Sequence, residues 1–387
     1  MLDPLFSWLL LPLGMALGWA LARRRSPAVT AISGEQLGGL IGQIASDDPD
    51  QAIAALNTAA ELDPSTAELH LQLGRMFRKR GEVDRALRVH EALATRGGLA
   101  PAVQLRARYE LAQDYMSAGV MDRAEQLFTE LAGQGAYAVE AAEAIRTIHE
   151  QAREWRPAIE AARRLQAVKG ESQSAAIAQY FCELAEEARR EKRTDEAIRL
   201  VQQALGEDRT CVRAHLMLGE LREAAGDHAA AARAYLKAFE HDPRFLPDVI
   251  EPLQRCFAAN GDRDGFLLFL KDAKEMSSSS LPFVAEARLL AETGVDPLDH
   301  LVQGLESRPS RAVLAEFLEA LERQPNLIDS GLGRPAASLR KALLRLMEAT
   351  PKYQCSHCGF TPKQMFWQCP GCKHWGTTAP ADDVLRA

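Results

Sequence analysis

The feature that most constrains this fold is an internal repeat that runs through most of the chain. The stretch LHLQLGRMFRKRGEVDRALRVHEAL at 69–93 has a counterpart in AHLMLGELREAAGDHAAAARAYLKAFEHDP at 214–243. Each contains Leu-Gly, a glycine seven residues later and an alanine five residues after that. Small residues at these points let two helices approach closely. A single helix pair cannot bury its apolar face, so such units are expected to stack into an array.

The repeated pattern resembles the tetratricopeptide repeat, in which two helices form a unit of 34 residues. The copy that fits best carries the following positions of that pattern: Leu218, Gly219, Gly226, Ala231, Tyr235, Ala238 and Pro243. The resemblance predicts an all-α fold, a tetratricopeptide superhelix over 35–275. Weaker helical patterns predict degenerate helical repeats over 276–350. An aromatic content of only 6% agrees with helices rather than sheets.

Repeat arrays of this kind hold segments of other proteins in a groove lined by the first helix of each unit. Mapping the register of the pattern onto this chain predicts a charged groove that is basic early in the array and more acidic late. Solvated helix faces would give the same pattern, so the groove is a hypothesis. The candidate partner-binding residues are Arg75, Arg78, Arg106, Tyr109, Gln113, Glu186 and Arg189, with Glu68, Glu220 and Glu223 beside them.

Four of the seven cysteines form a C-x2-C-x10-C-x2-C cluster near the C-terminus, at Cys355, Cys358, Cys369 and Cys372. Two such turns bring four thiolates onto one metal ion in a reducing compartment, whereas an oxidising compartment would favour disulfides. CSHCG and CPGC look like the knuckles of a rubredoxin or a zinc ribbon. We therefore predict a metal-binding module over 351–378. Its ion is iron or zinc, because a tetrahedral set of sulfurs suits both.

Four thiolates fill the coordination shell, so the module is expected to stabilise structure rather than catalyse. His357 and His374 are expected to be neighbours of the ion and not ligands. A segment of this size cannot bury a sufficient core of its own. Its aromatic residues are therefore predicted to pack onto the helical array. The remaining cysteines, Cys182, Cys211 and Cys256, sit singly in apolar helical patterns and are expected to be buried.

The N-terminus contains an uncharged stretch of 18 residues at 5–22, followed at once by Arg23, Arg24 and Arg25. This length suffices for a membrane-spanning helix, and the position of the arginines predicts a cytoplasmic body. A cleaved signal peptide is the alternative, but its positive charge would precede the apolar run. We predict an uncleaved anchor over 1–25. Gly14 and Gly18 form G-x-x-x-G, a weak signal for contact with a partner helix or a homo-oligomer.

The remaining sequence argues against two classes of function. The net charge of −7 disfavours a nucleic-acid-binding body. Lysines and aromatics around the cysteines leave a minor alternative in which the module grips a nucleic-acid strand. No Walker loop, H-E-x-x-H, G-x-S-x-G or dinucleotide fingerprint occurs, so the chain is not expected to be an enzyme.

The order of these parts resembles the lipopolysaccharide assembly protein B family. The resemblance covers the whole chain, and GRMFRKRGEVDRA at 74–86 and YQCSHCGFTPKQMFWQCPGC at 353–372 are its most specific segments. It implies an inner-membrane adaptor that acts with the membrane protease FtsH to control degradation of the deacetylase LpxC. It also implies a membrane antagonist protein of the lipopolysaccharide-sensing type, contacts with lipopolysaccharide assembly proteins, and a rubredoxin-type domain that packs against the repeats.

Two alternatives remain from the sequence. The first is a scaffold for lipopolysaccharide synthesis and export enzymes that has no role in proteolysis. The second is a periplasmic repeat protein whose four clustered cysteines form two disulfides.

Overall fold

A computed structural model describes residues 64–133, 135–324 and 333–381. They divide into two compact units, and the break falls between Tyr137 and Ala138. The predicted membrane anchor, with Gly14, Gly18, Arg23, Arg24 and Arg25, lies outside these residues. Within the described ranges, no helix combines the length and the apolar character needed to cross a membrane.

The first unit consists of helices that pack against their neighbours in sequence. Its core contains Leu71, Leu93, Ala107 and Leu111. The elements are α4 (Pro64–Lys79), α5 (Val83–Thr95), α6 (Pro101–Ser117), α7 (Met121–Ala132) and the short 3-10 helix η1 (Gly135–Tyr137).

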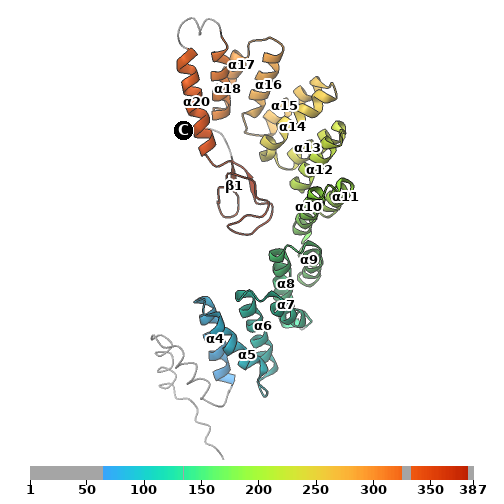
Figure 1. The fold of residues 1–387 in the computed structure, drawn as a ribbon, viewed down its shortest axis with the longest axis vertical. Coiled ribbons are helices and arrows are strands. Elements are labelled where there is room, and N and C mark those ends of the chain that lie inside the picture. The colour runs from blue at the N-terminus through green and yellow to red at the C-terminus, as the bar shows by residue number, and fades with distance from the viewer. Residues whose placement is uncertain (1–63, 134, 325–332, 382–387) are drawn as a thin grey trace, which may run out of the picture. The chain divides into compact units, whose positions relative to one another are not determined.

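The second unit continues the succession of helix pairs and ends in a small non-helical module (Figure 1). Its helices are α8 (Ala138–Ala152), α9 (Trp155–Lys169), α10 (Ser174–Arg190), α11 (Thr194–Glu207), α12 (Val212–Ala224), α13 (His228–His241), η2 (Pro243–Phe245), α14 (Leu246–Ala259), α15 (Arg263–Met276), α16 (Leu281–Glu292), α17 (Leu298–Ser307), α18 (Arg311–Glu322) and α20 (Gly333–Ala349). The mainly helical fold predicted from the repeats is confirmed. Cys182, Cys211 and Cys256 are buried, as expected.

The close approach predicted between the helices of a unit is visible at Gly219. A Cβ atom at this position of α12 would lie 2.4 Å from Cε1 of Tyr235 on α13. Tyr235 is only 2% exposed, and its hydroxyl donates a hydrogen bond of 3.0 Å to Glu223. The ring packs directly over position 219, and α12 and α13 approach closely because this position has no side chain.

The turns between paired helices explain why some repeat units are hard to see in the sequence. Gly226, between α12 and α13, has a φ of 78°, in the left-handed region that glycine adopts easily. The corresponding turns before α9 and α11 place Arg153 at 58° and Lys192 at 62°. These two units keep the geometry of the repeat without its marker residue.

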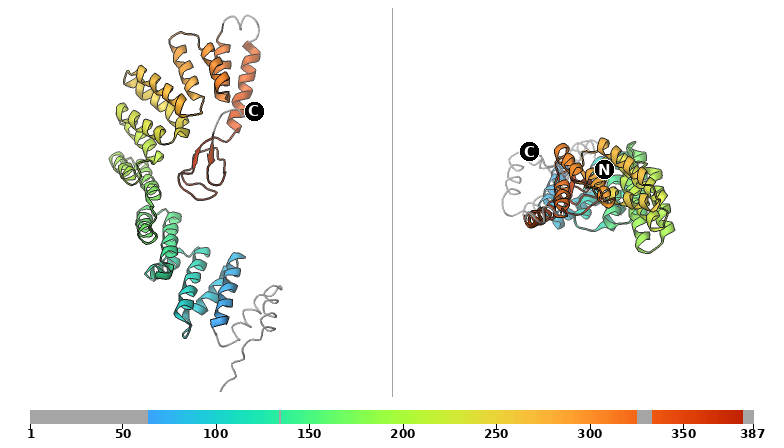
Figure 2. Two further views of the ribbon diagram at one scale, coloured as in Figure 1. Left: turned by 180° about the vertical axis from the view of Figure 1, so that it is seen from behind. Right: turned by 90° about the horizontal axis from the view of Figure 1, so that it is seen from above.

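The C-terminal module contains a two-stranded antiparallel sheet. Strand β1 (Tyr353–Cys355) pairs with β2 (Thr378–Pro380), and Cys355 lies opposite Thr378. The module therefore includes residues 379 and 380, beyond the end at 378 predicted from the cysteine spacing. The module lies beside helices of the second unit in Figure 1 and in the left view of Figure 2.

The packing of Gly219 can be tested with a pair of Gly→Ala variants. Gly219→Ala should reduce the free energy of unfolding by about 2 kcal/mol, because the added methyl group overlaps the Tyr235 ring and forces it to shift. Gly206→Ala is the control, since a Cβ at this exposed position of α11 meets nothing within 4 Å. It should stabilise the helix by about 0.5 kcal/mol. Chemical denaturation measures both, and equal effects of the two substitutions would contradict the packing described.

Candidate metal centre and the adjoining cleft

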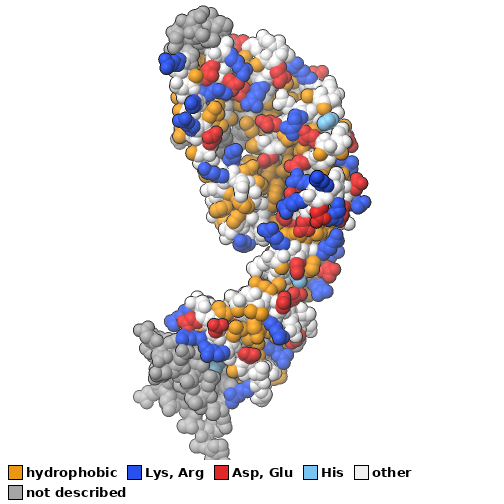
Figure 3. Space-filling model, in the orientation of Figure 1, with side chains coloured by type: hydrophobic (Ala, Val, Ile, Leu, Met, Phe, Trp, Pro, Cys, Tyr) orange, Lys and Arg blue, Asp and Glu red, His pale blue; other side chains and the backbone are white. Residues whose placement is uncertain are grey.

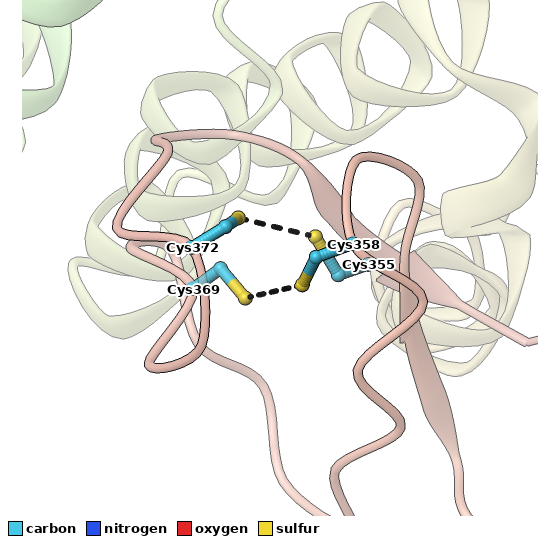
Figure 4. A group of neighbouring side chains, drawn as sticks. All are labelled: Cys355, Cys358, Cys369 and Cys372. Carbon is cyan, nitrogen blue, oxygen red and sulfur yellow. Dashed lines mark hydrogen bonds between the residues drawn. The ribbon is translucent and has the colours of Figure 1, made fainter.

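The four clustered cysteines converge from two facing turns, as Figure 4 shows. Cys355 Sγ lies 3.8 Å from Cys372 Sγ, and Cys358 Sγ lies 3.6 Å from Cys369 Sγ. A tetrahedron of thiolates with metal–sulfur bonds of about 2.3 Å has edges of about 3.8 Å. A disulfide would need sulfurs about 2.05 Å apart. The spacing thus fits the predicted four-thiolate metal site, for zinc or for iron.

Backbone hydrogen bonds hold the two turns in matching conformations. Gly359 N donates to Cys355 O at 3.0 Å, and Lys373 N donates to Cys369 O at 2.8 Å. Gly359 has a φ of 76° and Lys373 a φ of 62°. Lys373 replaces the glycine that often follows the last cysteine of such knuckles, yet it adopts the conformation that glycine favours. The second turn therefore keeps its geometry at a cost of about 1 kcal/mol.

The surroundings of Cys355 favour its thiolate form. Burial acts to raise the pKa of this thiol. Side-chain interactions with Thr377 and Cys369 and hydrogen bonds from the backbone amides of Cys358 and His357 outweigh that effect and lower the pKa to about 6. Thr377 Oγ1 lies 3.3 Å from the sulfur. A thiolate is the form that binds a metal ion, so the local hydrogen bonds prepare this ligand.

The two histidines of the module lie beside the cysteine cluster. Their rings are 3.9 Å apart between centroids, and His374 Nδ1 lies 3.0 Å from its neighbouring carbonyl, Cys372 O. Both rings are exposed. Because the four thiols already provide a complete tetrahedral set, the histidines are not needed as ligands.

One edge of the module packs on α8, α9 and α10 through Trp375. Its ring meets Tyr180 and Trp155 edge-on, at centroid distances of 5.9 and 6.1 Å. The indole Nε1–H donates a hydrogen bond of 3.2 Å to Glu150 Oε1. Glu150 also accepts from Arg146 at 2.7 Å and from the Tyr180 hydroxyl. The polar end of Trp375 is therefore paired, while its ring joins the core of the repeats.

The other edge of the module packs on α12, η2 and α14. Trp367 stacks on Phe245 with a centroid distance of 5.7 Å, and the Arg213 guanidinium lies 5.6 Å from the centre of the Trp367 ring. Ala379 and Met365 join the same apolar cluster. The Tyr353 hydroxyl donates to Asp248 at 3.4 Å. The prediction that the aromatics of the module pack onto the helical array is confirmed for Tyr353, Trp367 and Trp375. It is wrong for Phe360, whose side chain is 40% exposed.

Between the module and α10, α12 and α14 the structure contains a cleft of about 810 Å³. The predicted groove residues Glu186, Arg189, Glu220 and Glu223 all line it. Charged side chains of both signs and apolar side chains lie together on this part of the surface (Figure 3). Met365 and Trp367 of the module form part of its wall. The sequence indicated that Trp367 packs on the repeats, but it gave no signal that Trp367 or Met365 lines the groove.

The predicted groove residues of the first unit are largely engaged with other residues. Arg75 donates to Glu110 at 2.6 Å, and Arg78 contacts Glu110 at 2.7 Å and Asp114 at 2.5 Å. His90, which is fully buried, lies 2.5 Å from the other oxygen of Asp114. Burial acts to raise the pKa of Glu110, but the two arginines outweigh it and lower that pKa.

The other three candidates in the first unit also have partners. Arg106 pairs with Glu68 at 2.7 Å, Tyr109 stacks on Tyr137 at 4.6 Å, and Gln113 donates to the Tyr109 hydroxyl at 3.2 Å. The buried acids Glu110 and Asp114 were missed by the sequence reasoning. The signal that could have found them is a pair of acidic residues four positions apart, which lie on the same face of α6.

A stack of helix pairs with a four-thiolate ribbon docked on it defines a tetratricopeptide-repeat protein with a rubredoxin-type module. Two family models agree. One, described as a rubredoxin metal binding domain, matches residues 353–380, and one for the tetratricopeptide repeat matches residues 43–101 and 182–244.

The chain is similar over nearly its full length to curated proteins named lipopolysaccharide assembly protein B. It is 29% identical to the protein of that name from Escherichia coli strain K12, with 98% of each chain covered. It is also 29% identical to the Haemophilus influenzae protein, with 99% of each chain covered. These matches confirm the resemblance to the lipopolysaccharide assembly protein B family. A crystal structure of the MamA protein is 19% identical over 48% of this chain and 96% of that chain, with a TM-score of 0.33.

Substitution of a metal ligand tests the role of the centre. Cys355→Ser and Cys369→Ser should reduce bound metal from one ion per chain to nearly none. Metal binding contributes about 10–16 kcal/mol to the folding of small zinc modules, so residues 353–380 should become sensitive to protease. Elemental analysis and limited proteolysis measure these outcomes. Cys256→Ala, which removes a buried thiol of α14, should leave the metal content unchanged. Full metal content in the ligand variants would exclude this site.

Proposed function

We propose that this protein is an inner-membrane adaptor that regulates lipopolysaccharide synthesis. In this proposal it promotes degradation of the deacetylase LpxC by the membrane protease FtsH. An apolar helix within residues 1–25 anchors it, Arg23, Arg24 and Arg25 keep its body on the cytoplasmic side, and Gly14 and Gly18 contact another membrane helix. The further partners are a membrane antagonist of the lipopolysaccharide-sensing type and other lipopolysaccharide assembly proteins.

The observation that carries this proposal is the cleft shared by the repeats and the metal module. Its volume of about 810 Å³ lies within the range of binding sites, about 300–1,000 Å³. Its wall includes Trp367, whose place depends on the module, and Glu186 and Arg189 of the repeats. A binding surface with these two components suits an adaptor that holds a segment of another protein. The full-length similarity to proteins named for lipopolysaccharide assembly supports the pathway.

The chemistry of the centre supports a binding role rather than an enzymatic one. Residues Cys355, Cys358, Cys369 and Cys372 together provide four sulfur ligands. A bound ion with four thiolate ligands supplies structural cross-linking and has no open position for a substrate. The chain's own residues hold the module against the helices, and the module completes the cleft.

The half-life of LpxC tests the proposal against the scaffold alternative. In cells depleted of this protein, LpxC should persist several-fold longer after synthesis is stopped. The wild-type chain and Cys256→Ala should restore turnover, whereas Cys355→Ser should not, because its module is released from the repeats. A blot of LpxC over time gives the half-life. Unchanged turnover on depletion would contradict the adaptor role and favour a scaffold.

A further inference from the structure

The cleft contains more carboxylates than its arginines neutralise. Arg213 pairs with Glu183 at 2.8 Å, and Arg255 pairs with Glu223 at 2.8 Å. Arg189 and Arg190 both contact Glu186, at 2.8 and 3.6 Å. These pairs account for all four arginines that line the cleft.

The cleft contains two further carboxylates, Glu220 and Asp248, whose negative charge is balanced less fully by neighbouring groups. Glu220 lies 3.4 Å from Arg189, which bonds Glu186 more closely. One carboxylate oxygen of Asp248 accepts a hydrogen bond of 3.4 Å from the Tyr353 hydroxyl. Its other oxygen, Oδ2, is shielded from solvent and has no hydrogen-bond partner among the described residues.

The electrostatic environment shows the same deficit of positive charge. Burial raises the pKa of Asp248 to about 6; the Tyr353 hydrogen bond opposes this rise and the negative charge of Glu220 adds to it. Burial also raises the pKa of Glu220, and its contact with Arg189 only partly offsets that rise. A cation placed between the two carboxylates would lower both pKa values and restore the charge balance.

Apolar side chains lie in the same cleft. Leu216 and Met217 of α12 and Met365 and Trp367 of the module line it. A lone metal cation or a small amine would leave this surface without a partner. A protein segment supplies both a charged and an apolar side chain, and an acidic segment would meet arginines that are already paired.

We propose that this cleft binds a protein segment that places a lysine or arginine side chain between Asp248 and Glu220 and an apolar side chain against Met365 and Trp367. The inference rests on the proposed function, since it names the kind of segment that the adaptor holds. The cationic group supplies the positive charge that Asp248 lacks and that Arg189, bonded more closely to Glu186, gives Glu220 only in part. The apolar group covers the indole that the metal module provides.

The test uses the purified full-length chain and a positional-scanning library of nine-residue peptides. Lysine or arginine should be enriched at one position, with leucine, methionine or an aromatic residue a few positions away. The best peptide should bind Asp248→Asn and Glu220→Gln at least tenfold more weakly. Glu207→Gln is the matched control: its carboxylate pairs with Arg163 outside the cleft, so affinity should be unchanged.

A charge reversal separates recognition from damage to the fold. Asp248→Lys should shift the preference at the same peptide position from basic to acidic, while the chain still holds one metal ion. The proposal is overturned if the library shows no basic preference, or if acidic peptides are enriched on the wild-type chain. It is also overturned if the Asp248 and Glu220 variants bind the selected peptide like wild type. LpxC turnover that depends on the protein would survive each of these outcomes, so the two proposals fail separately.

Discussion

The contact between Trp375 and helices α8, α9 and α10 is an interaction on which the position of the metal module depends. The indole N–H reaches Glu150, the same carboxylate that accepts from Arg146 and Tyr180, and the ring lies edge-on to Tyr180 and Trp155. A half-buried indole is most stable with a packed ring and a paired N–H, and the contacts with these three helices provide both. The four cysteines give the segment its internal fold, and Trp375 at one edge, with Trp367 at the other, fixes its position on the helices.

The cysteine cluster governs the fold of the module, and the docking contacts govern its position on the helices. The thiolate cluster gives about two dozen residues a defined fold that their small apolar core could not maintain. Docking then positions Trp367 on Phe245 and brings Met365 to the cleft. The metal module is thus far from the cleft's charged residues in sequence but adjacent to them in space. The module contributes apolar side chains to the lining of the cleft, and the repeats contribute its charged side chains.

Much of this could be predicted because its physical signals are local. The helix pairs follow from Leu-Gly and alanine positions such as Gly219 and Ala231, and the metal ligands follow from the C-x2-C spacing. The docking of the aromatics followed from the size of the segment alone. The partners of Trp375 could not be predicted, because Glu150 lies more than 200 residues away in sequence and nothing local marks it. Likewise, the pairing of Arg75 and Arg78 on α4 with Glu110 on α6 depends on the packing of one repeat against the next. The register of the repeat pattern in the sequence does not reveal this packing.

Hydrogen exchange on the metal-loaded Trp375→Ala variant tests the central claim most directly. This substitution leaves all four thiolate ligands in place, so the chain should still hold one metal ion. If docking depends on Trp375, amides of residues 353–380 should keep the protection that arises within the knuckles. Amides of α10 around Tyr180 should exchange markedly faster than in the wild-type chain. Wild-type protection throughout α10 in the metal-loaded variant would contradict the account.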